Sequence, residues 1–399
     1  MRYCSSDKLT AGMILAKPLY TDKNKLLLGA GNKLTDTFIL RVRNLNLSYI
    51  CIAEPGTERI TIDDPVDDSV LVTLKQQLRD IFDEVLIVLR SKRRSCKTID
   101  GLVKKVSEDR YVAPIDKTIG SIRYLVEDVH LKSLSHWDAL LNFSKCVGWR
   151  EHGVDVALIS ILLAYQYQFK FEQLIHLGLG ALLHDLGKAY MPEIAAKRRS
   201  DLNAEEIELY RKHPMLGVSL LEYHSKGHYV AKECLLQHHE KLNGKGFPKG
   251  LTGEHLPPVS KRKYAANEIY HYAEIVSVAD AYVNLVTGAW YKRPMTPDAA
   301  LSRIIHAMSD TLNRPVSRML AKIILPFPTG APVRITHCAM IEYVGFYGVV
   351  SVPNRHAPHK ADLVLYADSQ GKNIRPESIN LKGDSSAELE LDVTNDEQD

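Results

Sequence analysis

The feature that most constrains the fold is a long stretch, from Val154 to Leu325, in which nearly every segment repeats its apolar residues at helical spacing. Apolar side chains at every third and fourth position line one face of a helix, and that face must pack against a partner to leave water. Clusters of glycine and proline, such as GKGFPKGLTG and HLPPVSK, interrupt the pattern and separate one helix from the next. This stretch therefore predicts an all-α bundle.

The segments on either side of the bundle have a different pattern. Residues 8 to 54 alternate short apolar runs with turn signals, which is typical of a small α+β module. After Pro326, short β-branched runs separated by polar turns indicate a small β module, and the acidic end of the chain is expected to be a solvated tail. We therefore predict a mainly α protein with these parts: an α+β module at 1–61, a helical connector at 62–135, the helical domain at 136–325, a β module at 326–382 and an acidic tail at 383–399.

A long amphipathic helix is predicted within the connector. Its apolar residues recur at three- and four-residue spacing from Val70 to Leu89, and a second helical stretch covers about 115 to 130. This stripe exceeds what a lone connector helix needs, so we expect a homodimer formed through residues 62–135. The alternative is that the stripe packs on the helical domain of its own chain.

Composition excludes several classes of protein. The formal net charge of +3 does not call for DNA as a partner, and an anionic small molecule would need only a local basic site. No apolar run has the length of a signal peptide or of a membrane helix, so we expect no membrane association. The six cysteines are scattered without a CxxC pair, which favours reduced thiols and a cytoplasmic protein.

Histidine and aspartate residues in the helical region are the candidates for chemistry. A single histidine on a helix is more often a surface or core residue than a ligand. However, the pair His184-Asp185 follows the apolar run LGLGALL, and Asp280 follows AEIVSVA, so both carboxylates emerge from segments that should be buried. A buried charge needs a compensating partner, and a metal ion is one that also recruits imidazoles. The seven candidate ligands are His152, His184, Asp185, His213, His238, His239 and Asp280.

This mixed set of nitrogen and oxygen ligands favours Fe, Mn, Zn or Ni over Ca. We expect the ligands at successive helix ends, because adjacent residues such as His184 and Asp185 diverge on a regular helix and can converge only where it ends. Gly187 is expected to supply that end for the first pair, and the glycine-rich run NGKGF supplies it for His238-His239. The alternative for either pair is a polar helix terminus without a metal.

The order of these motifs resembles the HD-GYP group of metal-dependent HD-domain hydrolases. The strings HDLGKAYMPE, KHPMLG, HHEKLNGKGFPKGLTG and IVSVADAYVNL follow in the family's order and at similar spacing, and HGVDVA at 152 to 157 resembles the helix that precedes them. The resemblance covers about 150 to 325, and the segments on both sides resemble small modules often found beside this domain. It implies an HD-type helical bundle and a bacterial signalling phosphodiesterase that hydrolyses cyclic di-GMP to pGpG and/or GMP.

The resemblance also implies roles for single residues. His152, His184, Asp185 and Asp280 would hold one divalent metal ion, and Asp185 would bridge to a second ion held by His213, His238 and His239. Lys188, one turn past the His-Asp pair, would neutralise charge in the transition state or protonate the leaving oxygen, with Asp185 as the other catalytic residue. Phe247 and Lys292 would contact substrate, and Arg293 is expected to compensate there for the family arginine that Ala289 replaces.

Several positions depart from the family pattern. The family's GYP is GFP here, with Phe247 in place of the tyrosine, and Gly148 stands where some members place a glutamate for a third metal, so we expect two ions, Fe, Mn or Zn. Ala289 replaces a family arginine, Glu274 stands at another arginine position, and SKRKYAANE at 260–268 is an insertion that is either a lid or a solvated loop. These departures leave two alternatives open: a cyclic dinucleotide receptor that has lost turnover, and an HD phosphohydrolase for another nucleotide.

Overall fold

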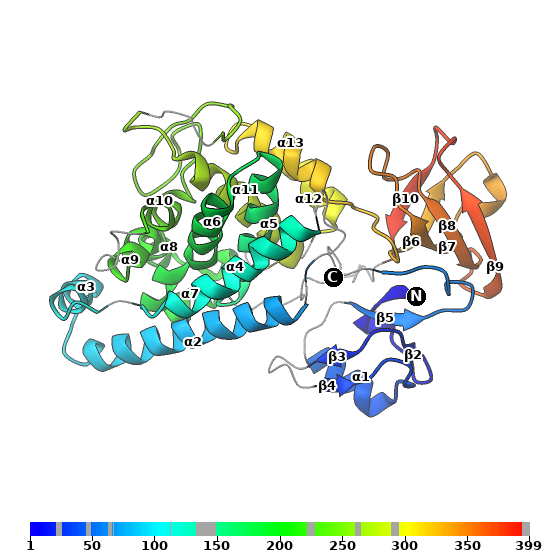
Figure 1. Cartoon of the computed structure of the whole chain (residues 1–399), viewed down its shortest axis with the longest axis horizontal. Helices are drawn as coiled ribbons and strands as arrows, with labels where there is room; N and C mark the ends of the chain where they lie inside the picture. The colour runs from blue at the N-terminus through cyan, green and yellow to red at the C-terminus, as the bar shows by residue number, and fades with distance from the viewer. Residues whose placement is uncertain are drawn as a thin grey trace. The chain divides into compact units, whose positions relative to one another are not determined.

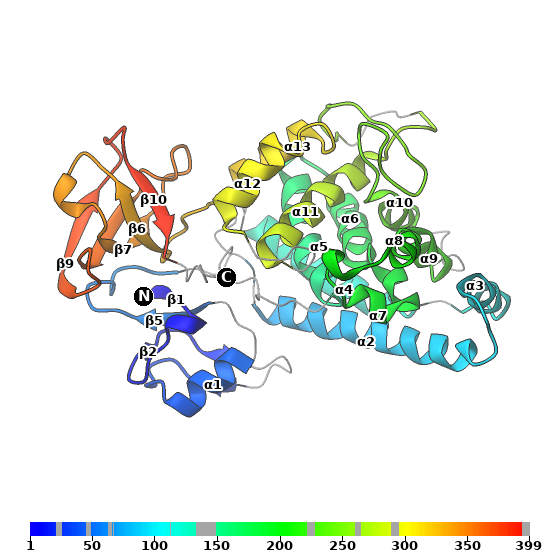
Figure 2. The same cartoon turned by 180° about the vertical axis from the view of Figure 1, so that it is seen from behind.

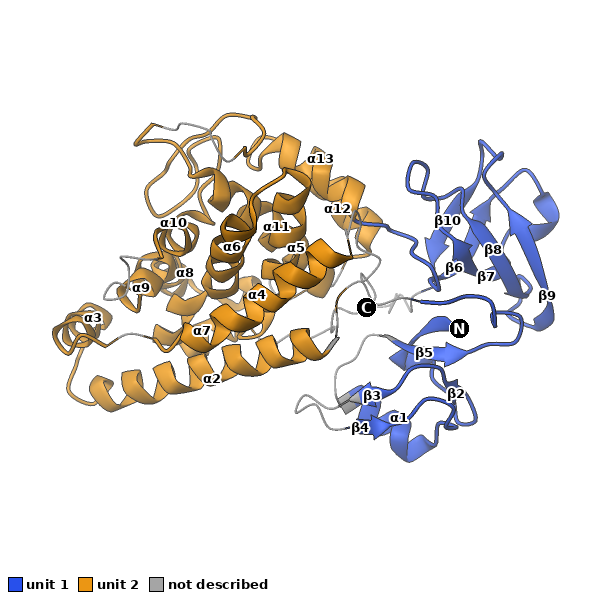
Figure 3. Ribbon diagram, viewed as in Figure 1, with its two compact units in different colours: residues 1–65, 136–145, 324–399 blue, residues 66–135, 146–323 orange. Residues whose placement is uncertain are grey.

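The computed structural model describes residues 1–20, 26–44, 49–62, 66, 68–111, 113–132, 149–221, 228–259, 265–288 and 295–392. Helices predominate among them (Figure 1), which confirms the mainly α fold class. The described residues fall into two compact units (Figure 3). The helical unit lies within Val66–Ser135 and Cys146–Ile323, and the β unit lies within Met1–Pro65 and Ile324–Asp399.

The helical unit is built around two strongly apolar helices, α5 and α6. Every residue of α5 from His152 to Ala164 is buried, and nine of the thirteen residues of α6 are buried, because both helices are strongly apolar and are enclosed by others. The helices of this part are α5 (His152–Gln166), α6 (Phe171–Leu183), α7 (Pro192–Ala195), α8 (Ala204–Tyr210), α9 (His213–Ser219), α10 (Tyr229–Gln237), α11 (His271–Thr287), α12 (Pro297–His306) and α13 (Arg314–Ile323), with 3-10 turns η3 (Leu186–Tyr190) and η4 (Arg199–Asp201).

The helices predicted in the connector belong to this same unit. They are α2 (Asp68–Arg93) and α4 (Asp116–Leu131), and Figures 1 and 2 both show α2 beside α4. A further helix between them, α3 (Ile99–Glu108), was not predicted. The apolar stripe of α2 is buried within the chain: Leu74, Leu78 and Val85 have no exposed surface, and Phe82 packs edge-on against Trp149 with ring centroids 4.9 Å apart. Packing within the chain thus accounts for the apolar stripe. The homodimer stays a prediction, and the stripe no longer supports it.

Ion pairs join α2 to the start of α5. Arg79 lies 3.4 Å from Glu151, Asp83 lies 2.6 Å from Arg150, and the buried carboxylate of Asp155 lies 3.5 Å from Lys75. The three α2 residues are spaced four apart, so they occupy one face of the helix, next to the apolar stripe. The polar and apolar faces of α2 therefore both serve to fix it against the bundle.

The β unit contains antiparallel sheets. The first has the strand order β1-β5-β2, from β1 (Arg2–Ser5), β2 (Ile14–Leu15) and β5 (Tyr49–Ala53), and the second has the order β10-β6-β7-β8-β9. A short pair of β3 (Leu19–Tyr20) and β4 (Leu26–Leu28), the helix α1 (Asp36–Asn44) and the 3-10 turn η1 (Ser6–Lys8) complete the first part. The second part comprises β6 (Pro332–His337), η6 (Ile341–Tyr343), β7 (Tyr347–Val352), β8 (Asp362–Ala367), β9 (Asn373–Asn380) and β10 (Glu388–Leu391).

The two ends of the chain share one hydrophobic core in this unit. Tyr3, Ile60 and Ile62 pack in the same cluster as Val333 and the other buried residues of the second sheet. A backbone hydrogen bond from Tyr3 N to Gly330 O, at 2.8 Å, reinforces the contact. The modules expected at 1–61 and 326–382 therefore form one compact body.

The prediction of a solvated tail from residue 383 was wrong for its first part. Glu388–Leu391 forms β10, which pairs with β6, and Leu389 and Leu391 are each 4% exposed. The sequence ELEL alternates acidic and apolar residues, and in a strand this period of two places both leucines on the buried face. Residues 393–399 lie outside the described residues. No described helix combines the length and the apolar character that a bilayer-spanning segment needs.

Candidate metal centre

The His184-Asp185 pair stands where α6 gives way to a 3-10 turn. The α6 helix ends at Leu183, Asp185 has φ −97° and ψ 8°, and η3 begins at Leu186. This change of path lets the two neighbouring side chains converge, with His184 Nε2 3.3 Å from Asp185 Oδ2. The helix end was predicted, but the role assigned to Gly187 was wrong: Gly187 lies inside η3, against the backbone of His213 in α9.

The seven candidate ligands lie together, and Asp185 belongs to two groups of them. In the first group, ligand atoms of His152, His184 and Asp185 lie within 4.8 Å of one another, and in the second those of Asp185, His213, His238 and His239 do so. Asp280 adjoins the first group, because its Oδ1 lies 2.7 Å from His152 Nε2 and 3.5 Å from His184 Nε2. The shared carboxylate of Asp185 thus stands between two clusters of imidazoles.

Asp280 reaches the centre from the interior of a helix. We expected each ligand at a helix end, which holds for His152, His213 and His238, but Asp280 lies in the body of α11. One turn later, Asn284 Nδ2 donates a hydrogen bond to Asp280 Oδ1 at 2.8 Å. Because residues four apart share a helix face, this amide holds the carboxylate toward the cluster.

Three of the imidazoles are oriented in the same way. The Nδ1 atoms of His184, His213 and His238 lie 2.7, 2.7 and 2.9 Å from the carbonyl oxygens of the residues three positions earlier. A ring that donates Nδ1–H to a carbonyl presents Nε2 as a lone pair, which is the arrangement of histidines that bind metals. Each of these rings therefore directs its Nε2 atom into the cluster.

The inner atoms of the cluster fit a cation. Nε2 of His213 and Nε2 of His238 lie only 3.2 Å apart, although both rings use Nδ1 for a backbone carbonyl. Across the described part of the chain, the buried side-chain atoms without a hydrogen-bond partner include Nε2 of His184 and of His239 and Oδ1 of Asp185. Buried polar atoms normally have partners, so converging nitrogen and oxygen atoms that lack them indicate a site for a metal ion. These residues fit the ligand chemistry of a divalent transition metal.

The protonation of the carboxylates supports this interpretation. Burial by itself raises the pKa of Asp185, but His184 and Lys188 outweigh burial and hold it well below its usual range. Burial likewise acts to raise the pKa of Asp280, whereas His152 and His184 hold it well below the usual range. Both carboxylates are therefore ionised, as metal ligands must be.

The imidazoles divide into neutral and protonated rings. Burial, with the nearby rings of His184 and His213, lowers the pKa of His238 to about 3, and burial also lowers the pKa of His213. Burial favours a lower pKa for His184 too, but Asp185 and Asp280 raise it to about 10. The proton on His184 thus balances two buried carboxylates, and a bound cation would replace it.

Lys188 lies beside the shared carboxylate, as predicted from the sequence. Its Nζ is 2.5 Å from Asp185 Oδ2 and 5.2 Å from the centre of the Tyr210 ring, and the residue is 9% exposed. Burial acts to lower the pKa of Lys188, but Asp185 and Tyr210 raise it above its usual value. Lys188 therefore places a permanent positive charge at the cluster.

The GFP loop is anchored by a residue that sequence reasoning missed. Glu240, 2% exposed, accepts hydrogen bonds from Lys249 N at 2.6 Å and Leu251 N at 2.9 Å, and Phe247 N donates to His239 O at 3.2 Å. Its position in the sequence could have indicated this role. Glu240 follows the ligand pair and precedes a glycine-rich loop, and an acidic residue there can accept hydrogen bonds from the loop's backbone amides. Phe247 packs on His239 with ring centroids 4.6 Å apart.

Of the remaining positions singled out in the sequence, one lies within the described part of the chain. Glu274 is a buried structural residue, 1% exposed, whose Oε2 accepts a hydrogen bond from Asn313 Nδ2 at 2.9 Å. It therefore joins α11 to the start of α13. Lys292, Arg293, Ala289, Gly148 and most of the basic part of the insertion, 260–264, lie outside the described residues.

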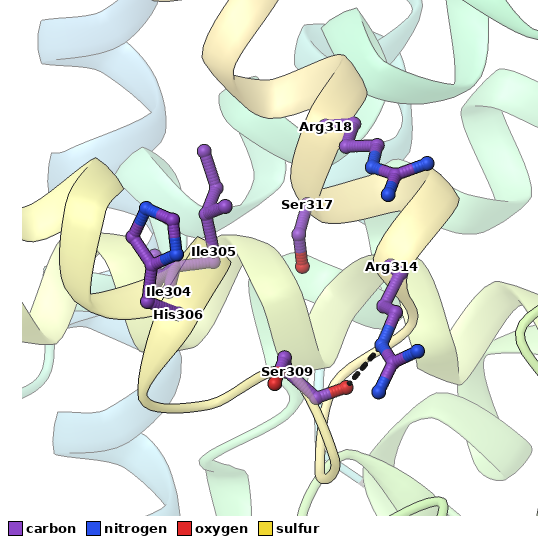
Figure 4. A pocket seen from close by; sticks show the side chains of 7 residues that line it. All are labelled: Ile304, Ile305, His306, Ser309, Arg314, Ser317 and Arg318. Atoms are coloured by element: carbon purple, nitrogen blue, oxygen red, sulfur yellow. Dashed lines mark hydrogen bonds between the residues drawn. The ribbon is translucent and has the colours of Figure 1, made fainter.

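A separate cavity of about 250 Å³ lies at α12 and α13 (Figure 4). Arg314, which lines this cavity, donates a hydrogen bond to Ser309 O at 3.1 Å and forms an ion pair with Asp310 at 3.0 Å. The residues that line it are Ile304, Ile305, His306, Ser309, Arg314, Ser317 and Arg318, and the seven candidate ligands are not among them.

Comparisons with known proteins agree with the site. Residues 156–313 match the family model described as the HD domain. The cyclic di-GMP phosphodiesterase response regulator RpfG of Xanthomonas campestris is 29% identical over 41% of this chain and 42% of its own length. A cyclic di-GMP phosphodiesterase of Pseudomonas aeruginosa is 27% identical over 53% of this chain and 49% of its own length. This chain thus spans less than half of each relative.

A solved structure of Bd1817, a HDG"Y"P protein from Bdellovibrio bacteriovorus, matches 80% of this chain and 97% of its own, with a TM-score of 0.45 and 18% identity. The family match over 156–313 contains six of the seven candidate ligands, and His152 precedes it by four residues. The motifs and the buried cluster thus agree with the family match: residues 156–313 match the HD domain, in line with the resemblance to the HD-GYP group.

Proposed function

We propose that this chain is a metal-dependent phosphodiesterase that hydrolyses cyclic dinucleotides in bacterial signalling, with cyclic di-GMP as substrate and pGpG and/or GMP as product. The observation that carries the proposal is the carboxylate of Asp185, which lies within 4.8 Å of ligand atoms in two separate groups of histidines. A carboxylate shared by two such groups is the arrangement that hydrolytic two-metal sites use. The names of relatives from Xanthomonas campestris and Pseudomonas aeruginosa support the same substrate.

We assign two divalent transition metal ions, Fe, Mn or Zn, to the centre. His152, His184, Asp185 and Asp280 would hold one ion, and Asp185, His213, His238 and His239 would hold the other. The mixture of imidazole and carboxylate suits these metals, and the buried Nε2 atoms of His184 and His239, which lack hydrogen-bond partners, support the assignment. When bound, such ions supply Lewis acidity, which activates water and polarises a phosphate.

The chain's own residues would complete the chemistry. Asp280, held by Asn284, fixes the His152 ring, and the backbone carbonyls fix the three rings that direct Nε2 inward. Lys188 would stabilise the charge that develops on the phosphate oxygens and leaving oxygen, because its ammonium group is buried and kept protonated beside Asp185. Phe247 forms part of the site wall, and Lys292 and Arg293 are proposed as further contacts to substrate.

One assay distinguishes the proposed function from two alternatives. A 3'3'-cGAMP-specific phosphodiesterase of Vibrio cholerae is 30% identical over 37% of this chain and 26% of its own length, which favours testing that nucleotide as well. The other alternative is a receptor that binds cyclic dinucleotides without turnover. Retention of all seven candidate ligands and Lys188 favours an enzyme over a receptor.

The test is purification under anaerobic conditions, elemental analysis, and incubation with cyclic di-GMP or 3'3'-cGAMP followed by chromatography. We expect two metal ions per chain and conversion of cyclic di-GMP to pGpG or GMP, with loss of activity after chelation. Binding of cyclic di-GMP without product, in fully metal-loaded protein, would identify a receptor instead. Faster hydrolysis of 3'3'-cGAMP would reassign the substrate.

A further inference from the structure

The side chain of Arg211 stands at the edge of the metal centre and has no assigned role. We propose that Arg211, supported by Phe247, binds the second, non-reacting phosphodiester of a cyclic dinucleotide while the first phosphodiester lies at the metal centre. The inference rests on the proposed function, which supplies the substrate class. It would make Arg211 a specificity-determining residue, because substrates with one phosphate could not use it.

Three planar side chains lead outward from the centre. The ring of His239, a member of the second ligand group, lies 4.6 Å from that of Phe247, with 33° between the ring planes. The guanidinium carbon of Arg211 lies 5.1 Å from the centre of the same Phe247 ring. Phe247 also lies edge-on to His213, at 6.4 Å between centroids. Phe247 therefore links the ligands to the half-exposed cation of Arg211.

The Phe247 ring is held firmly enough to position that cation. Glu240 binds the loop's backbone through Lys249 N and Leu251 N, and Phe247 N is bonded to His239 O. Gly246 permits the tight path, since a Cβ there would lie 2.4 Å from Lys241 N. The loop and the ligand pair before it thus form one connected structure, which fixes the backbone of Phe247.

Arg211 itself is accessible. It follows α8 and precedes the ligand His213 by two residues, and its side chain is 45% exposed. Its pairing with Glu208 is loose, at 3.7 Å between exposed groups, and such a pair contributes little. The aromatic face restrains the guanidinium plane while leaving its N–H groups available, which favours donation to phosphate oxygens.

The chemistry of the substrate class matches this arrangement. A cyclic dinucleotide carries two phosphodiesters in one ring, and only one can occupy the metal centre at a time. The second remains negatively charged and requires a cation outside the ligand cluster. A guanidinium is suited to that task because its planar set of donors fits phosphate oxygens.

The test compares two substrates in the full-length, metal-loaded protein: cyclic di-GMP, and methyl p-nitrophenyl phosphate, which has one phosphodiester and no base. We expect Arg211→Ala to raise the KM for cyclic di-GMP by about tenfold, the cost of one lost charged hydrogen bond, without changing kcat or metal content. The constants for methyl p-nitrophenyl phosphate should not change. Arg211→Lys should retain most of the affinity, because it keeps the charge.

Controls separate binding from structure. Glu208→Ala removes the loose partner of Arg211 and should leave both substrates unaffected, and Arg318→Ala removes an exposed arginine that lines the other cavity. The proposal is overturned if Arg211→Ala affects both substrates equally or loses metal, if Glu208→Ala reproduces the effect, or if Arg211→Lys is as impaired as the alanine variant. If the wild type binds cyclic di-GMP without hydrolysing it, the phosphodiesterase assignment fails. The Arg211 proposal is then tested by calorimetric Kd values for the wild type and Arg211→Ala, and equal values overturn it. If the wild type neither binds nor hydrolyses it, both fail.

Discussion

Replacement of Gly187 by alanine should disrupt the metal centre through a backbone contact. A Cβ at Gly187 would lie 1.9 Å from His213 O and 2.5 Å from Gly217 N, both backbone atoms. Neither atom can rotate away as a side chain would. The substitution must therefore separate η3 from α9, which carries His213 away from Asp185, from which its Nε2 is now 3.3 Å distant.

The size of the effect follows from the nature of the clash. Adding a methylene to a packed core costs about 1–3 kcal/mol, and we expect the upper end because backbone must move. For a unit of this size, a loss of about 3 kcal/mol corresponds to a Tm decrease of roughly 6–12 °C. The second ligand group should also lose affinity for metal, because one of its imidazoles is displaced.

The measurement is thermal unfolding in the presence of chelator, followed by metal titration of the folded protein. Gly120→Ala is the matched control: Gly120 is exposed inside α4, and a Cβ there meets nothing within 4 Å. That variant should gain up to about 1 kcal/mol from helix propensity. If Gly187→Ala unfolds at the wild-type temperature and binds metal with wild-type affinity, the argument from close backbone approach is wrong.

Three further predictions concern the site and the assembly. Asp185→Ala should lose both metal ions, whereas His152→Ala should weaken only the first group, and elemental analysis that found full metal in Asp185→Ala would contradict the shared ligand. Lys188→Ala should keep its metal and lower turnover by roughly 100-fold, with a smaller effect on ground-state affinity, and single-turnover kinetics with unchanged rates would place Lys188 outside the chemistry. Light scattering at micromolar concentration tests the homodimer predicted from the sequence through residues 62–135, and the mass of a monomer would remove that prediction.

The sequence was informative wherever the deciding interactions are local. Helical periodicity identified the bundle, and the apolar runs before His184 and Asp280 showed that both carboxylates emerge from buried helices. The break after Leu183 was also predictable, because adjacent histidine and aspartate can converge only where a helix ends. Each of these signals comes from residues that are close together in the sequence, so a single segment is enough to detect it.

Other features depended on which segments pack together. The stripe of α2 indicated that an apolar face is covered, but not that the cover comes from its own chain, because hydrophobic contact is non-directional. Likewise, β10 became a strand because β6 provides its hydrogen-bond partner, and Gly187 is required by the distant backbone of His213. The sequence by itself thus determined which helical segments are apolar enough to be buried and which chemical types gather in the helical region. Only the tertiary structure decided which atoms meet, because contacts between residues far apart in the chain depend on how all the elements pack at once.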